Sequence, residues 1–260
     1  MISRKRLQLD SSCKSTKSEA LQGLEKFFPH LHGFREGQEE VISSLLRGEN
    51  AAAIFPTGGG KSLCYQLSGM MLAAEGMTLV VSPLLALMKD QVDSMKALGH
   101  PVDLIASSQS LEEKINVRKK VQSGQIVILY LAPEQLNNEN TVALLRSVKI
   151  ALLAIDEAHC ISEWGHAFRP DFLRLAKFYR DENVKRILAL TATATPQVER
   201  EICSQFDIPE TNSIRTAFFR PNLEINFTST SQGERDTHLV RSIQSQKPGA
   251  TQLFKRRQRK

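Results

Sequence analysis

The chain has 260 residues, of which 41% are hydrophobic and 24% are charged, as in an ordinary globular protein. This composition excludes a wholly disordered chain, a collagen-like fibre and a small disulfide-stapled protein. The formal net charge is +6, but residues 19–246 carry −4, because residues 1–18 carry +4 and residues 247–260 carry +6. The basic character therefore belongs to the two ends of the chain and is weak evidence that its body binds nucleic acid.

The cysteines and the hydropathy pattern favour an intracellular protein. Cys13, Cys64, Cys160 and Cys203 are far apart and form no CxxC pair, so they suggest neither a zinc site nor a disulfide framework. No apolar run approaches the roughly 20 residues that span a bilayer, and the charged N-terminus lacks the apolar region of a secretory signal. We expect no membrane partner, and a location in the nucleus if the source is eukaryotic and otherwise in the cytoplasm.

Short apolar runs alternate with helical patterns along most of the chain. Residues 36–47 have apolar side chains at helical spacing. The apolar runs that follow are residues 51–55, 78–81, 102–105, 126–131, 150–155 and 186–190. They are continuous rather than alternating, which is typical of strands buried on both faces of a parallel sheet.

The helical patterns between these runs complete an α/β fold. Residues 84–98 predict a helix with one apolar side, formed by Leu84, Leu87, Met88, Val92, Met95 and Leu98. Ser110 and Glu113 form the pattern of a capping box, and Thr195-Pro196 is a plausible cap and first turn of a later helix. The alternation predicts a mostly parallel sheet with helices on both faces.

A glycine-rich loop follows the run at 51–55 and precedes a helix predicted to begin near Lys61. Its glycines let the backbone N–H groups form a nest for phosphate oxygens, and the helix adds its positive N-terminal end. Lys61 is suited to the β- and γ-phosphates, and the Ser62 hydroxyl is suited to Mg²⁺. The spacing departs from strict GxxxxGK[ST], because Phe55 replaces the first glycine, and a glycine-rich hairpin is the alternative. The candidate ATP-binding residues of the loop are Thr57, Gly58, Gly59, Gly60, Lys61 and Ser62.

An acidic pair follows the apolar run at 150–155. Asp156 is placed to hold Mg²⁺, as Ser62 is, and Glu157 is placed to orient and deprotonate an attacking water. Alone, such a pair is commonly a surface turn, but with the glycine loop it indicates a nucleotide hydrolase whose catalytic residues are Lys61, Asp156 and Glu157. The chain contains no GxGxxG, HRD or DFG, which disfavours a dehydrogenase or a kinase.

The segment DEAHCISEWGHAFRPDF at 156–172, together with PTGGGKS at 56–62, resembles the RecQ family of DNA helicases, which belong to superfamily two and carry a DEAH box. Further matches occur in the family's order at residues 34–38, 82–91, 130–134, 191–195 and 219–222. The resemblance covers about residues 24–227. It implies a RecA-like P-loop lobe that uses ATP and Mg²⁺ and acts on single-stranded or forked DNA, with 3′-5′ unwinding in recombination and repair.

The resemblance also implies roles for residues outside the glycine loop. Arg35 and Gln38 match the adenine-recognition motif, and an amide offers the donor and the acceptor that the edge of adenine requires. His159 would sit between the water site and the aromatic-rich loop that follows. Thr191 and Thr193 would relay between the two lobes, and the alternative is that they are ordinary hydroxyls at the end of a strand. The loop residues that would contact DNA and couple it to hydrolysis are Trp164, His166, Phe168 and Arg169. Aromatic faces stack on unpaired bases, although Trp164 and Phe168 would also serve to anchor the loop to the core.

These assignments divide the chain into three segments. We expect a disordered basic tail at 1–18, the helicase ATP-binding lobe at 19–227, and an incomplete linker and start of a second lobe with a basic tail at 228–260. In the family the second lobe supplies an arginine finger that stabilises the transferred phosphoryl group. The chain is interpreted as the first lobe only, C-terminally truncated. Two functions stay open: an ATP-dependent DNA helicase, and an ATP- and DNA-binding fragment with weak turnover and no autonomous unwinding. A protein partner is not identified.

Overall fold

The computed structural model describes residues 16–162, 169–182, 184–217, 229, 231 and 233–245. They belong to two compact units that divide between residues 218 and 219. The second unit contributes one described helix, α9 (Arg235–Ser245). All other described elements belong to the first unit, which carries the candidate site.

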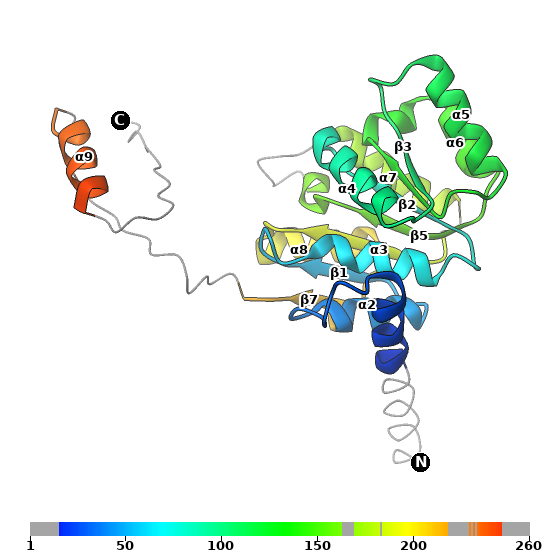
Figure 1. Cartoon of the computed structure of the whole chain (residues 1–260), viewed down its shortest axis with the longest axis horizontal. Coiled ribbons are helices and arrows are strands. Elements are labelled where there is room, and N and C mark those ends of the chain that lie inside the picture. The colour runs from blue at the N-terminus through cyan, green and yellow to red at the C-terminus, as the bar shows by residue number, and fades with distance from the viewer. Residues whose placement is uncertain are drawn as a thin grey trace, which may run out of the picture. The chain divides into compact units, whose positions relative to one another are not determined.

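The first unit contains a parallel sheet with the described strand order β3-β4-β2-β5-β6-β1-β7 (Figure 1). The strands are β1 (Ala51–Ile54), β2 (Met77–Val81), β3 (Val102–Ile105), β4 (Ile128–Leu131), β5 (Ile150–Ile155), β6 (Ile187–Thr191) and β7 (Ser213–Arg215). Every residue of β1 to β6 is buried, which is why their sequences are continuously apolar. The predicted α/β class and parallel sheet are confirmed.

Helices cover both faces of this sheet. The α-helices are α2 (Gln38–Leu46), α3 (Lys61–Met71), α4 (Leu85–Ala97), α5 (Leu111–Gln122), α6 (Glu139–Arg146), α7 (Pro170–Asp181) and α8 (Pro196–Gln205), and residues 16–27 are also helical. Short 3₁₀ turns lie at η1 (Pro133–Asn137), η2 (Ala158–Ile161) and η3 (Glu210–Asn212).

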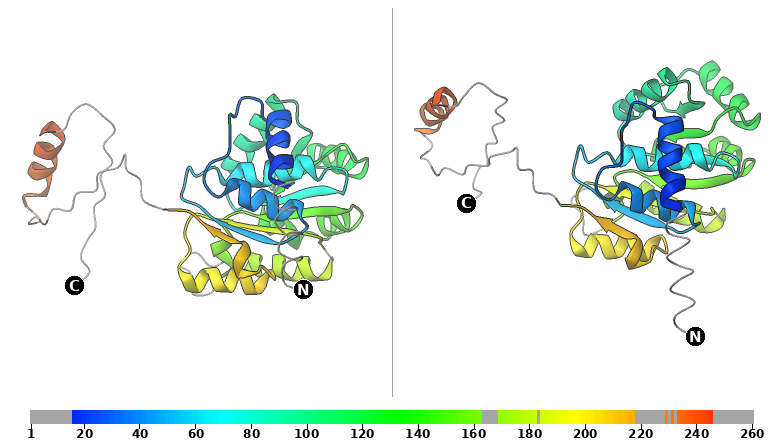
Figure 2. Two further views of the ribbon diagram at one scale, coloured as in Figure 1. Left: turned by 90° about the horizontal axis from the view of Figure 1, so that it is seen from below. Right: turned by 60° about the horizontal axis from the view of Figure 1, so that its bottom comes forward.

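One core cluster packs helix 16–27 with α2, α3 and α4 against one face of the sheet, and the other packs α5 to α8 against the opposite face. In Figure 2 the dark-blue helix 16–27 and the yellow α8 lie on opposite faces.

The helix starts predicted from capping residues are confirmed. The Ser110 hydroxyl accepts a hydrogen bond from Glu113 N, and the Glu113 carboxylate accepts one from Ser110 N, which is the reciprocal capping box. The Thr195 hydroxyl accepts from Val198 N, with Pro196 in the first turn of α8.

Three details differ from the sequence-based expectations. β7 was not predicted, because it has three residues and none of them is buried. Residues 16–18, assigned to the tail, are part of the first described helix. On α4 only Met88, Val92 and Met95 are buried, whereas the leucines predicted to share their side are exposed, namely Leu84, Leu87 and Leu98. The spacing i, i+4, i+7 of the buried residues gives one narrow stripe, and Leu84 and Leu98 are the caps of the helix rather than part of that stripe.

The strand order brings the chemistry-bearing segments to one edge. β2, β5, β6 and β1 are successive neighbours, and because parallel strands point the same way, their carboxyl ends lie side by side. Ser82 follows β2, Asp156 follows β5, Thr191 is the last residue of β6, and the glycine loop follows β1. No described helix is long and apolar enough to cross a membrane.

Candidate nucleotide site

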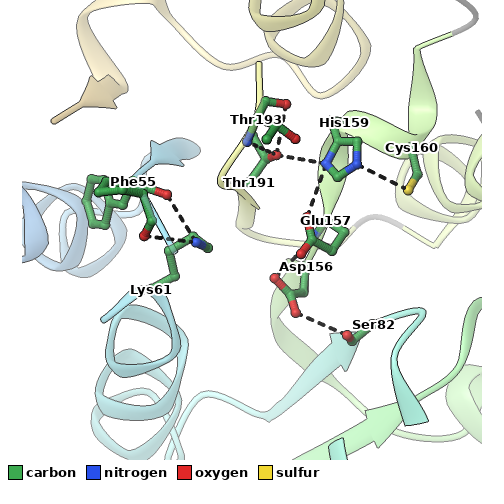
Figure 3. A network of polar contacts seen from close by, with 10 residues as sticks. Phe55, Lys61, Ser82, Asp156, Glu157, His159, Cys160, Thr191 and Thr193 are labelled. Carbon is green, nitrogen blue, oxygen red and sulfur yellow. Dashed lines mark hydrogen bonds and ion pairs between the residues drawn. The ribbon is translucent and has the colours of Figure 1, made fainter. Parts of the chain in front are cut away.

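The glycine loop joins β1 to α3 and needs two left-handed backbone positions. Gly58 has φ +80° and Gly60 has φ +78°, a region that side chains with a Cβ enter at a cost. Gly60 is also the N-cap of α3, so Lys61 and Ser62 occupy the first turn, as expected. The Lys61 ammonium donates to the carbonyl oxygens of Phe55, at 3.0 Å, and Pro56, at 3.4 Å (Figure 3). Loop and lysine therefore form one folded unit.

Gln38, the first residue of α2, and Arg35, three residues before it, hold this loop. The Arg35 guanidinium donates to the Gly58 carbonyl oxygen, and Gln38 Nε2 donates to the Gly60 carbonyl oxygen at 2.8 Å. The Gln38 carbonyl oxygen accepts from Arg35 N at 2.8 Å. Gln38 is 2% exposed, so its amide is buried among these partners. The geometry gives both residues a role in positioning the phosphate loop, and their expected contact with adenine stays a prediction.

Asp156 lies at the end of β5, buried against the end of β2. Its Oδ2 accepts a hydrogen bond from the Ser82 hydroxyl at 3.0 Å (Figure 3). Its backbone N–H donates to the Val81 carbonyl oxygen on β2. Burial raises the pKa of Asp156, and the neighbouring Glu157 charge raises it further, while Ser82 and Lys61 act in the opposite direction. Asp156 Oδ1 accepts from Glu157 N at 3.0 Å, so both donors are neutral, and a buried carboxylate of this kind favours a cation beside it.

Glu157 is held in an uncommon backbone conformation and in an ion pair. Its φ is +53°, and its Oε2 lies 3.1 Å from His159 Nδ1. The contact with His159 holds the pKa of Glu157 below its usual range, although burial opposes the shift. His159 has its pKa raised to about 9, because its Nε2 lies 3.9 Å from the Cys160 sulfur and its Nδ1 faces Glu157. At neutral pH the pair is therefore an imidazolium and a carboxylate.

His159 connects this pair to β6. Its Nδ1 lies 2.9 Å from the Thr191 hydroxyl, which donates to the Thr193 carbonyl oxygen and accepts from Thr193 N (Figure 3). A continuous polar chain therefore leads from Glu157 to Thr193, and the expected role of these residues in coupling stays a prediction.

Lys61 shares the site with both acids. Burial lowers the pKa of Lys61, while the charges of Glu157 and Asp156 act to raise it. The acidic pair lies about 95 residues after Lys61 in the sequence. In the fold the charges of both acids nevertheless act on the Lys61 ammonium of the glycine loop.

Other sequence-based candidates lie outside this cluster. Trp164, His166 and Phe168 lie outside the described residues. Arg169 is exposed, and its backbone N–H donates to the Cys160 carbonyl oxygen at 2.9 Å, which ties the end of its loop to the DEAH segment.

Two contributors to the site were not predicted. Ser82 was included only in the match to the family at residues 82–91, and Cys160 was given no role of its own. The place of Ser82 directly after a buried strand was the available signal, because strands β2 and β5 end at one edge. The position of Cys160 next to His159 gave no comparable signal.

The residues fit a nucleotide and a hard divalent cation. At Gly58 the space that a Cβ would take is open, which leaves the backbone of the loop accessible to a phosphate, and Lys61 supplies a cation. Ser62 and Asp156 supply a hydroxyl and a carboxylate oxygen, and Mg²⁺ in nucleotide sites uses one or two carboxylates together with phosphates and water. The donor set is thus of the type that ATP and Mg²⁺ require.

A comparison with protein families matches DEAD/DEAH box helicases over residues 35–202. The chain belongs to this family. It is 40% identical over 231 residues to the ATP-dependent DNA helicase RecQ of Haemophilus influenzae, covering 89% of this chain and 36% of that protein. It is 42% identical over 204 residues to RecQ of Bacillus subtilis, covering 78% of this chain and 34% of that protein. The resemblance to RecQ helicases is confirmed, and the chain spans about a third of the length of these relatives.

Solved structures confirm the fold. The helicase domain of Pyrococcus furiosus Hef superposes with a TM-score of 0.55 at 19% identity, over 72% of this chain and 38% of that one. A hypothetical ATP-dependent RNA helicase from Sulfolobus tokodaii gives a TM-score of 0.57 at 22% identity, over 78% of this chain and 57% of that one. These are helicase domains, as the expectation of a RecA-like lobe requires.

Proposed function

We propose that this chain is the ATP- and DNA-binding lobe of a RecQ-type helicase, which binds single-stranded or forked DNA and in which ATP hydrolysis drives 3′-5′ unwinding of the duplex. The observation that supports it most is the convergence of Lys61, Asp156 and Glu157 at the carboxyl ends of β1 and β5, the two neighbours of β6, with Glu157 linked to Thr191 on β6 through His159. The RecQ relatives are ATP-dependent DNA helicases by name, which points to the same activity.

In the proposed reaction each residue has a separate task. The glycine loop and Lys61 bind and orient the β- and γ-phosphates, and Ser62 and Asp156 hold Mg²⁺, which when bound neutralises the charge of the phosphates. Glu157 orients the attacking water and accepts its proton. Since His159 keeps the pKa of Glu157 low, Glu157 is a weak base in this state, and the water is activated mainly by its position.

DNA contact is proposed at the same edge of the sheet. α4 begins at Leu85 without a side-chain cap, so its first backbone N–H groups are available to an anion such as a DNA phosphate. Lys89 is exposed one turn further along, and Leu84 and Leu87 offer exposed apolar side chains beside it. Arg169 adds an exposed cation at the end of the loop that follows the DEAH segment. The resemblance to RecQ helicases is the support for a proposed role in DNA recombination and repair. The proposed location is the nucleus if the source is eukaryotic and otherwise the cytoplasm.

The test is the ATPase rate of the purified chain with and without single-stranded DNA. Lys61→Ala is expected to abolish turnover and weaken ATP binding, whereas the exposed Lys177→Ala on α7 is expected to keep both. Turnover that survives Lys61→Ala would refute the assigned site. ATP and DNA binding without turnover would instead favour the second function, a binding fragment that needs a finger from elsewhere, because such a finger is worth about 10³–10⁵ in rate.

A further inference from the structure

The sheet of the first unit ends at β3, and among the described strands none pairs with the outer side of this strand. On its inner side, the pair formed by Val102 and Ile128 uses the Pro101 carbonyl oxygen, which accepts from Ile128 N on β4. The backbone groups of successive strand residues point to opposite sides, so those of Leu104 point outward. An edge of this kind offers unpaired N–H and C=O groups to any further strand.

One side chain bonds the outward backbone groups of Leu104 and Ala106. Gln109 Nε2 donates to the Leu104 carbonyl oxygen at 3.0 Å, and Gln109 Oε1 accepts from Ala106 N at 2.9 Å. In a parallel pair of strands, one residue of the added strand makes the same two hydrogen bonds to the residues that flank its opposite number. The Gln109 amide therefore occupies the place that a residue opposite Ile105 would have in a further strand.

Asp103 bonds the outward N–H group of Leu104. Asp103 is 6% exposed, and its Oδ1 accepts from Leu104 N at 3.1 Å. Lys96 Nζ on α4 lies 3.0 Å from the Asp103 Oδ1, and Lys120 Nζ on α5 lies 3.3 Å from its Oδ2. Because α4 and α5 cover opposite faces of the sheet, the two lysines approach the carboxylate from both faces. Two cations and one acid leave this edge net positive, and such charges oppose the pairing of edge strands.

We propose that Gln109, Asp103, Lys96 and Lys120 form an edge cap that keeps β3 from pairing with β3 of a second copy of this chain. A second copy fits an uncapped edge, because two identical strands related by a two-fold axis satisfy each other. In that antiparallel pair the N–H and C=O groups of Leu104 would bond those of Leu104 in the other copy. The edge cap concerns self-association and is independent of the proposed function.

The test removes the Gln109 amide and follows the oligomeric state of the full chain. Gln109→Leu bonds neither backbone group. Gln109→Asn keeps an amide but is one methylene shorter, so it is too short to bond both groups and adds no apolar surface. Gln197→Leu, at an exposed glutamine of α8, is the matched control for the apolar surface that leucine adds. Sedimentation velocity over a concentration series gives the mass, and amide hydrogen exchange read by mass spectrometry gives the protection of residues 102–106.

We expect the unchanged chain and Gln197→Leu to stay monomeric, and both Gln109 variants to form dimers as the concentration rises. In the monomeric variants the Ala106 N–H group should exchange about 2–10-fold faster, the factor that one hydrogen bond is worth. In the dimers residues 102–106 should regain their protection. Added salt should strengthen the dimers, because it screens the repulsion between the lysines of the two copies.

Three results would overturn the inference. If both Gln109 variants stay monomeric up to their solubility limit, the edge does not pair when its cap is removed. If they form dimers in which residues 102–106 exchange as fast as in the monomer, the copies associate elsewhere. If the unchanged chain already dimerises with residues 102–106 protected, the cap does not prevent pairing. Where Gln109→Leu fails to fold, Gln109→Asn decides by the same criteria.

Discussion

Gln38 Nε2 lies 2.8 Å from the carbonyl oxygen of Gly60, so a buried amide on α2 fixes the last residue of the glycine loop before α3 begins. The same contact explains why this position is a glycine. A Cβ at Gly60 would lie 2.4 Å from Gln38 Nε2, in a backbone with φ +78°. Gly58 has a similar φ of +80°, but nothing lies within 4 Å of its Cβ position. The two glycines thus share a conformational requirement and differ in packing.

Comparing Gly60→Ala with Gly58→Ala separates these two effects. Both variants pay the cost of a left-handed alanine, about 1–2 kcal/mol. Only Gly60→Ala must also displace Gln38 and leave its buried amide short of a partner, which adds about 1–3 kcal/mol. We expect urea unfolding to show a lower free energy of unfolding for Gly60→Ala than for Gly58→Ala. Equal losses in the two variants would mean that Gln38 does not support the loop.

The ion pair between His159 and Glu157 predicts a pH-dependent site. The folded pKa of His159 is raised from 6.5 to about 9, so the stabilisation is complete below about pH 6.5 and is lost as the pH rises through 9. We expect the His159 ring to titrate near pH 9 in an NMR experiment, with its signal assigned by its loss in His159→Gln. The stability difference between the unchanged chain and His159→Gln should shrink over the same interval. A midpoint near 6.5 would contradict the assigned pair.

Glu157→Gln tests the role of the acid without changing its size. Because the amide cannot accept the proton of the attacking water, we expect ATP hydrolysis to fall by about 10²–10⁴ while ATP affinity is retained. Glu182→Gln, at the residue that follows α7, is the control and should keep the rate of the unchanged chain. A normal rate of ATP hydrolysis in Glu157→Gln would show that Glu157 is not the base that accepts the proton of the attacking water.

The sequence predicted the sheet well because its signal is local. The strands β1 to β6 are short apolar runs buried on both faces, and each was found with its ends within two residues. β7 escaped because Ser213–Arg215 has no buried residue and is recognisable only through its pairing with β1. Too many residues were predicted on the buried face of α4. Helical spacing shows which side chains lie on one side of a helix, but it does not show how many of them the sheet will bury.

The residues of the candidate site that belong to a sequence motif were predicted as candidates. The residues that only the fold brings to the site were missed. The glycine loop and the acids after β5 each have a pattern in the sequence. No pattern pairs Ser82 with Asp156, because that contact depends on which strands become neighbours. No pattern predicts the contacts of the buried Gln38 amide either. Its nitrogen donates to the Gly60 carbonyl oxygen, and its oxygen accepts from Arg35 N.

The ion pair between Glu75 and Arg186 is expected to stabilise the fold more than an ion pair whose arginine is exposed. Arg186 precedes β6 and is 8% exposed, and its two terminal nitrogens donate to both Glu75 oxygens, at 2.9 and 3.0 Å. This contact keeps the pKa of Glu75 below its usual range.

Glu75→Ala would leave a buried guanidinium without its acceptor, and we expect it to lower the free energy of unfolding by about 2–4 kcal/mol in urea. The control is Glu182→Ala, which breaks a pair at 2.7 Å with Arg146, an arginine whose side chain is 59% exposed. Since solvent replaces the lost partner there, we expect a change of about 0–1 kcal/mol. Losses of equal size in the two variants would show that the burial of Arg186 does not decide the strength of its ion pair.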